Sequence, residues 1–255
     1  QFDLAKQLVE EMKGMCIEDA MMDEYGYVYG HIPATPGYEN CTAIGFLAHM
    51  DTAPDYSGEN VNTQIIENYD EKDVVLGTSG RTLTVKDFPS LKNMTGKTLI
   101  TTDGTTLLGA DDKAGIAEIM TVAEELLKGD IPHGNVCLAF TTDEEVGSGA
   151  CHMDLERFGA PYAYTVDGGP EGEIQFENFN AASAEFVIHG VNVHPGEAKD
   201  IMVNSMKIAM ELQGMLPEQE APEHTEGYEG FFHLMEMNGS VEETTMSYLI
   251  REFDA

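Results

Sequence analysis

The chain has 255 residues, of which 42% are apolar, and its 46 acidic side chains outnumber its 13 lysines and arginines to give a formal net charge of -33. This length and apolar content are enough for a buried core in one large domain or two small ones. So acidic a surface repels phosphate backbones and anionic membranes. We therefore expect neither nucleic acid nor a membrane among the partners.

The compartment can also be predicted from what the sequence contains. No segment approaches the roughly 18 consecutive apolar residues of a membrane-spanning helix, and the first residues do not have the pattern of a signal peptide. The four cysteines form no C-x-x-C pair and no spacing typical of disulfides. These features predict a cytoplasmic protein.

The first 178 residues alternate predicted helices and strands. An amphipathic helix is already running at Ala5 and Leu8, and a second one covers residues 116–127 and ends at Lys128-Gly129. A strand at 135–141 follows the second helix. This rhythm predicts an α/β fold with a mixed sheet and helices on its faces. Residues 55–98 form a long polar stretch, which in a compact domain is either functional or contains small strands.

The pattern changes near residue 178, where we expect a domain boundary that separates residues 1–178 from 179–255. A strand at 184–188, a helix face at 202–210 and two strands at 231–237 and 241–253 give the order β-α-β-β. Asn238-Gly239 is a strong signal for the hairpin turn between the last two strands. Gln1 is not an initiator methionine, and a strand runs almost to the last residue, so we expect a fragment of a longer protein.

Acids or a histidine follow four apolar, strand-like runs. These runs are residues 42–48, 107–110, 135–141 and 163–166, and the polar groups after them are His49 and Asp51, Asp111-Asp112, Glu144-Glu145 and Asp167. The carboxyl ends of strands in an α/β sheet converge on the ligand crevice. Carboxylate oxygens and imidazole are the donors of a metal site. The four groups together favour a metal-dependent hydrolase, although each alone is also typical of an exposed strand end or a turn.

Individual positions suggest separate roles. His49 and Asp51 are two residues apart on a strand, so both side chains point the same way, and Asp51 is placed to orient His49. Of the next pair, we assign Asp112 to capping the following helix and Asp111 to the metal.

Glu144 and Glu145 are neighbours and cannot both face one ion from a regular element. A glycine-rich turn can direct Glu145 to the ion and Glu144 to a water molecule as general base.

Several segments of the sequence resemble the M20 metallopeptidases. The residues that mark the superfamily are His49-Met50-Asp51-Thr52-Ala53-Pro54-Asp55, Gly109-Ala110-Asp111-Asp112-Lys113-Ala114-Gly115, Thr141-Thr142-Asp143-Glu144-Glu145-Val146-Gly147 and Val166-Asp167-Gly168-Gly169-Pro170. Segments at 177–182, 193–196 and 223–231 are similar to the tripeptide aminopeptidases of that family in particular.

The resemblance implies a zinc-exopeptidase-like catalytic domain with two Zn²⁺ per subunit, with Co²⁺ or Mn²⁺ as alternatives. Asp111 would bridge both ions, His49 and Asp167 would complete one, and Glu145 would serve the other. Asp51 would orient His49, and Glu144 would activate a water molecule for attack on a short peptide.

The resemblance also implies that residues 179–255 are part of an inserted α+β lid and dimerisation domain, which predicts a homodimer. His194 would reach a substrate in the partner's active site, and Arg251 would bind the substrate's carboxylate. His194 is equally consistent with a turn before Pro195, and Arg251 with a charge at a strand edge. The family supplies a last histidine ligand from a C-terminal segment that this chain lacks, so we expect the chain alone to bind metal weakly and to be inactive.

Three other functions fit parts of the sequence. The first is a different M20 hydrolase, such as a dipeptidase or an N-acyl amino acid deacylase, because substrate choice lies outside the shared core. The second is a non-catalytic metal-binding or dimerisation fragment. The third is an acidic interaction protein, which explains the charge but not the ligands at the strand ends.

Overall fold

The computed structural model describes residues 1–169 and 172–254 and divides the chain into two units, Gln1–Glu171 and Gly172–Ala255. The boundary expected near residue 178 lies a few residues after this division. Pro170, the last residue of one motif, lies outside the described residues. Among the described residues, no helix is long and apolar enough to cross a membrane.

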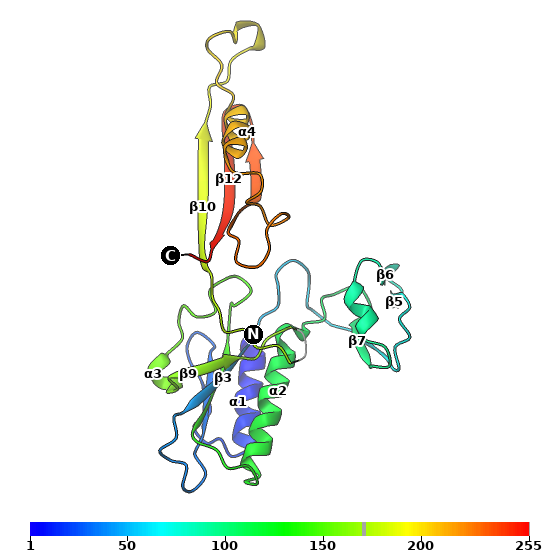
Figure 1. Cartoon of the computed structure of the whole chain (residues 1–255), viewed down its shortest axis with the longest axis vertical. Helices are drawn as coiled ribbons and strands as arrows, with labels where there is room; N and C mark the ends of the chain where they lie inside the picture. Colours follow the sequence, from blue (N-terminus) through cyan, green and yellow to red (C-terminus); the bar gives the residue numbers. More distant parts are fainter. Residues whose placement is uncertain (170–171, 255) are drawn as a thin grey trace. The chain divides into compact units, whose positions relative to one another are not determined.

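A five-stranded mixed sheet forms the centre of the first unit (Figure 1). Its strands, in spatial order, are β1 (Met21–Met22), β2 (Val28–Ile32), β8 (Val136–Thr141), β3 (Ile44–His49) and β9 (Tyr162–Thr165). β3 pairs in parallel with both β8 and β9, whereas β2 pairs with β8 in antiparallel fashion. The carboxyl ends of β3, β8 and β9 therefore lie at the same edge of the sheet.

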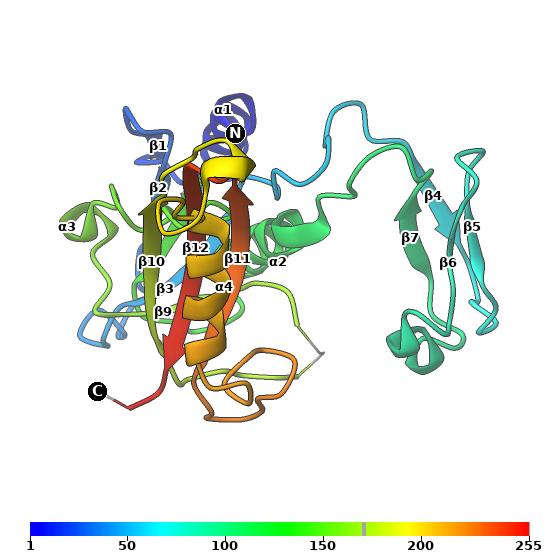
Figure 2. The same cartoon turned by 90° about the horizontal axis from the view of Figure 1, so that it is seen from above.

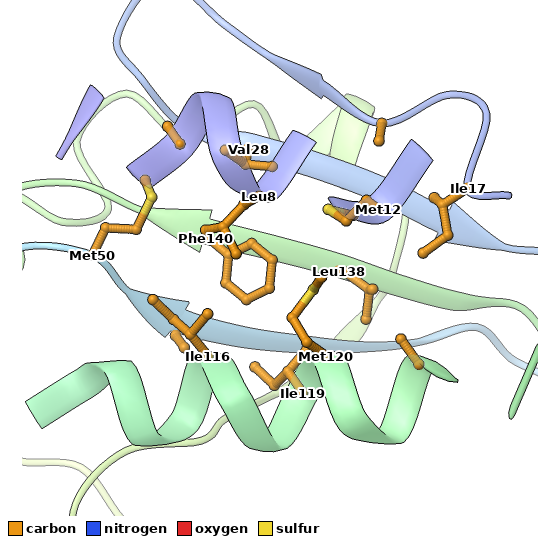
Figure 3. Packing of buried hydrophobic residues seen from close by; sticks show 14 of the residues in the cluster. Leu8, Met12, Ile17, Val28, Met50, Ile116, Ile119, Met120, Leu138 and Phe140 are labelled. Carbon is orange, nitrogen blue, oxygen red and sulfur yellow. The ribbon is translucent and has the colours of Figure 1, made fainter. Parts of the chain in front are cut away.

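Two long helices cover one face of this sheet. The apolar stripes of α1 (Phe2–Gly14) and α2 (Ala110–Leu127) pack with alternate residues of the strands in one buried cluster. Figure 3 shows Leu8 of α1, Phe140 and Leu138 of β8 and Ile116 of α2 in this shared layer. Burying such side chains contributes roughly 1.5–3 kcal/mol each.

The opposite face of the sheet carries a smaller cluster. Tyr27, Tyr29, Cys137 and Ala139 pack there against Phe158 of the short helix α3 (Leu155–Phe158). Helices thus lie on both faces, as the sequence predicts, but the two long ones share a face. β2 also belongs to the sheet, although no strand was predicted for residues 28–32.

The long polar stretch contains small strands with a core of their own. β4 (Thr63–Ile66) pairs with β7 (Leu99–Thr102), and β5 (Val74–Leu76) pairs with β6 (Arg81–Leu83), with a 3-10 turn η1 at Pro89–Asn93. Tyr69, Val74 and Leu76 are buried together there.

The second unit has the predicted order β-α-β-β. The elements are β10 (Asn180–His189), α4 (Ser205–Met215), β11 (Phe231–Gly239) and β12 (Glu243–Glu252), and a 3-10 turn η2 (Pro195–Glu197) lies in the connection between β10 and α4. The antiparallel sheet has the spatial order β10-β12-β11, and α4 lies across it (Figure 2). Ala209 of α4 packs against Met246 and Tyr248 of β12.

Two local predictions are wrong. Asn238-Gly239 does not form the hairpin turn, because both residues are paired within β11, opposite Thr245 and Thr244, and the chain turns at residues 240–242 instead. Residues 107–109 are not a strand. The Leu107 N–H bonds to the carbonyl of Ser57, and Gly109 takes a left-handed φ of 75°, which interrupts any extended run.

Candidate metal centre

The parallel strands bring the predicted metal-binding residues to one edge of the sheet. His49 is the last residue of β3, Glu144-Glu145 follow β8, and Asp167 follows β9. His49 is almost fully buried, and its Nε2 lies 2.9 Å from Asp111 Oδ1, 3.8 Å from Glu144 Oε2 and 4.0 Å from Asp167 Oδ2. These side chains are far apart in sequence and meet around one imidazole.

Two groups of donors are close enough to share an ion. One ligand atom each of His49, Asp111 and Glu145 lie within 4.8 Å of one another, and so do those of His49, Asp112 and Asp167. One imidazole surrounded by carboxylate oxygens is a donor set that suits divalent cations such as zinc. Carboxylates this close repel one another unless a cation lies between them. The residues present therefore fit a metal centre.

Asp112 supports the backbone. Its Oδ1 accepts the N–H of Gly115 at 3.2 Å, which is a capping contact of the kind predicted for this residue, and its Oδ2 accepts the N–H of His49 at 3.1 Å. Its burial raises the pKa of Asp112 to about 6. Asp111 differs, because 67% of its side chain is exposed. Of the two, Asp111 has the freer oxygens for an ion.

Close packing brings the start of α2 against the end of β9. A Cβ on Gly115 would lie 1.9 Å from the carbonyl oxygen of Val166 and 2.4 Å from Asp112 Oδ1. Only a glycine therefore fits between the helix that follows Asp111 and the strand that precedes Asp167.

Asp51 binds the turn that carries the two glutamates. Its Oδ1 accepts the N–H of Glu144 at 3.1 Å, and its Oδ2 accepts the N–H of Glu145 at 2.9 Å. Asp51 Oδ1 also lies 3.3 Å from Nδ1 of His49, but this contact does not have the geometry of a hydrogen bond. The sequence led us to expect that Asp51 orients His49. It did not predict that Asp51 binds the turn of Glu144 and Glu145, because nothing in the residues next to Asp51 indicates a contact with so distant a segment.

The turn itself depends on a second close approach. A Cβ on Gly149 would lie 2.9 Å from Cα of Glu144. The carboxylate of Glu144 is half exposed, and its partial burial raises its pKa, with the charges of Asp167 and Glu145 acting in the same direction. A raised pKa suits a carboxylate that accepts a proton near neutral pH.

The protonation of His49 is set by two opposing effects. Burial alone would lower the pKa of His49, but the hydrogen bond to Asp111 and the charges of Asp51, Asp112 and Asp167 outweigh burial and raise it. The imidazole thus lies in a strongly negative field.

The two remaining candidates lie in the second unit. His194 is exposed, and its Nδ1 accepts the N–H of Gly196 at 3.1 Å, so the neutral ring carries its proton on Nε2. Arg251 lies between two aromatic rings, with Cζ at 4.2 Å from the centroid of Phe179 and at 5.8 Å from that of Phe231. Arg251 forms no ion pair within 4.0 Å with a described residue.

Comparison with known proteins shows what the chain is related to. Residues 176–255 match the model of the peptidase dimerisation domain. The whole chain is 57% identical to peptidase T of Clostridium novyi over 256 residues, which cover 100% of this chain and 63% of the relative. This chain is a homologue of peptidase T. Peptidase T of Geobacillus thermodenitrificans is 58% identical, with 100% of this chain and 62% of the relative covered.

Solved structures support the fold. The chain superposes on aminopeptidase PepT from Bacillus cereus with a TM-score of 0.70 at 24% identity, covering 98% of this chain and 60% of that one. A tripeptidase from Staphylococcus aureus gives 0.67 at 20% identity, covering 98% and 60%. The chain spans less than two thirds of the length of these peptidase T relatives.

Proposed function

We propose that this chain carries catalytic residues of a cytoplasmic, metal-dependent aminopeptidase that releases the N-terminal residue from tripeptides. The observation that carries the proposal is the meeting of His49, Glu145 and Asp167, at the carboxyl ends of three parallel strands, with Asp111 at the start of α2. Similarity to peptidase T over the whole chain supports a peptidase activity.

We assign the ligands to two sets that share Asp111, whereas the donor atoms cluster as His49, Asp111 and Glu145 and as His49, Asp112 and Asp167. His49 and Asp167 would hold one ion with Asp111, and Glu145 would hold the other. Zinc suits imidazole combined with carboxylates, and Co²⁺ or Mn²⁺ are the alternatives. Two divalent ions bound there would lower the pKa of a water molecule and polarise the peptide carbonyl.

The neighbouring residues supply proton transfer and geometry. Glu144 accepts a proton from the attacking water and passes it to the leaving amine. Because this base is active only when deprotonated, kcat/KM is expected to fall as the pH drops through its raised pKa. Asp51 holds Glu144 and Glu145 by their backbone N–H groups and lies beside the ring of His49.

The second domain supplies substrate contacts and the dimer. We assign residues 1–178 to the catalytic domain and 179–255 to part of a lid and dimerisation domain, through which two copies associate. His194 presents its Nε2–H to the carbonyl oxygen of a substrate held by the partner. Arg251 binds the carboxylate of the tripeptide, for which a guanidinium fork is suited.

The test separates metal binding from catalysis. Elemental analysis of the complete protein is expected to give two ions per chain, and Asp167→Asn is expected to lose at least one. Glu144→Gln is the matched control, because it is expected to retain both ions while kcat falls by roughly 10²–10⁴-fold. A protein that hydrolyses tripeptides equally well after full metal removal would contradict the proposal.

Substrate class needs a comparison of its own. The complete protein is expected to cleave tripeptides with a higher kcat/KM than dipeptides or N-acylated amino acids. A preference for one of the latter would instead assign it to another hydrolase of the same superfamily. Metal binding without any hydrolysis would indicate a non-catalytic protein.

A further inference from the structure

A lysine lies beside the acidic cluster but is not bound to any one of its acids. The half-buried side chain of Lys113 donates a hydrogen bond from Nζ to Oγ1 of Thr52 at 3.0 Å. Lys113 forms no ion pair within 4.0 Å with a described residue. Its charge nevertheless acts on four carboxylates, those of Asp51, Asp111, Asp112 and Glu145.

The hydroxyl group of Thr52, which anchors the ammonium group of Lys113, explains this arrangement. The chain from β3 continues through Asp51 to Thr52, so the hydroxyl that holds the ammonium group lies next to the cluster. Lys113 lies against the backbone of Gly109, where an added Cβ would be in ordinary van der Waals contact with Nζ at 3.5 Å. A lysine paired directly with Asp111 or Glu145 would occupy oxygen atoms that a metal needs. Bound to a neutral hydroxyl, it contributes its charge and leaves those oxygens free.

We propose that Lys113 is a positioning residue that offsets the repulsion within the acidic cluster while leaving the ligand oxygens free for divalent ions. The inference rests on the proposed function, because it presupposes that the cluster binds metal. Its energetic consequence has a definite sign. Lys113 stabilises the metal-free protein more than the metal-bound one, because bound cations already neutralise the acids and repel the ammonium group.

Metal titration of Lys113→Met tests this without any assay of hydrolysis. Calorimetric titration with Co²⁺ alone is expected to show binding on the order of tenfold tighter than in the unsubstituted chain, because one positive charge near the ions is gone. The Tm of the metal-free variant is expected to fall by more than the Tm at saturating Co²⁺. A lysine with a merely structural role would lower both Tm values equally and leave the affinity unchanged or weaker, which would overturn the inference.

Three variants serve as controls. Lys113→Arg keeps the charge and is expected to bind Co²⁺ within about threefold of the unsubstituted chain. Lys128→Met removes a charge from the exposed, opposite end of α2, where Lys128 pairs with Glu125, and is expected to change nothing. Thr52→Val removes the anchor and keeps the charge, so its effect on affinity is expected to be smaller than that of Lys113→Met.

The failures can be told apart. If Thr52→Val reproduces the full effect, the hydroxyl contact rather than the charge is responsible, and the inference falls. If the complete protein, without any substitution, takes up no Co²⁺ at all, the proposed function fails first. Binding by the unsubstituted chain with equal affinity in Lys113→Met sinks the inference alone.

Discussion

Asp51 acts on the site through two backbone groups at once. Both of its oxygens accept N–H groups of the glutamate turn. Asn in its place keeps only one acceptor oxygen and turns its NH₂ group toward an N–H. We expect Asp51→Asn to destabilise the chain by about 1–3 kcal/mol, because a partly buried N–H group loses its charged acceptor, and to weaken metal binding. Urea unfolding and metal titration measure the two effects, with the exposed Asp55→Asn as control. Unchanged metal affinity would show that the turn does not depend on this carboxylate.

Arg251 is held by aromatic rings rather than by an acid. In a chain with 46 acids, a guanidinium between Phe179 and Phe231 with no ion pair to a described residue is free to bind an incoming carboxylate. We expect Arg251→Lys to raise KM for tripeptides by about tenfold or more with little change in kcat, because lysine has neither the fork nor the flat face for stacking. Steady-state kinetics of the complete protein checks this, with Phe179→Leu expected to shift KM in the same direction. A fall in kcat at constant KM would place Arg251 in the chemical step instead.

The roles of single residues could be predicted only where spacing carries the information. The two-residue spacing of His49 and Asp51 at the end of a strand predicts that both side chains point the same way, and Asp51 Oδ1 lies 3.3 Å from His49 Nδ1, although the orienting role stays a prediction. The contact between Lys113 and Thr52 could not be predicted, because it joins residues from different elements and depends on where α2 begins relative to β3. The same holds for Asp51, whose bonds run to the backbone of a distant turn.

At the scale of elements, α2 and the end of β9 pack closely because Gly115 has no side chain. We expect Gly115→Ala to force the start of α2 away from Val166 and to cost about 1–3 kcal/mol or more, as overpacking does. Since Asp111 precedes this point and Asp167 follows β9, metal affinity is expected to fall as well. Gly14→Ala is the matched control, because a Cβ on Gly14 of α1 meets nothing within 4 Å. Equal stability of the two variants by urea unfolding would refute the steric account.

Periodicity predicted long elements well and short ones poorly. The helix at 116–127 and the strand at 135–141 have enough apolar repeats to identify α2 and β8. The strands between residues 63 and 102 are three or four residues long, which is too short for a repeat to be recognised. The hairpin turn predicted at Asn238-Gly239 was wrong because the pairing of the strands, and not the local sequence, decides where the chain turns. The pairing between β11 and β12 continues as far as Gly239, which lies opposite Thr244.

At the scale of the whole molecule, the two separate cores lead to a further prediction. The metal candidates of the first unit lie beside its own core, and the second unit has a core of its own around Ala209, Met246 and Tyr248. A ligand that binds only the folded form of one unit stabilises that unit, by about 2.7 kcal/mol at a hundredfold excess over its Kd.

We therefore expect calorimetry of the chain to show two transitions, of which one shifts upward by several degrees when Zn²⁺ or Co²⁺ is added. The other transition is expected to stay where it is, and a chelator is expected to reverse the shift. His49→Ala provides the control, because its metal-free transitions report the loss of the imidazole while added metal should shift neither of them. If both transitions of the unsubstituted chain moved together, the two units would unfold as one, and metal bound in the first unit would stabilise the second unit as strongly as the first.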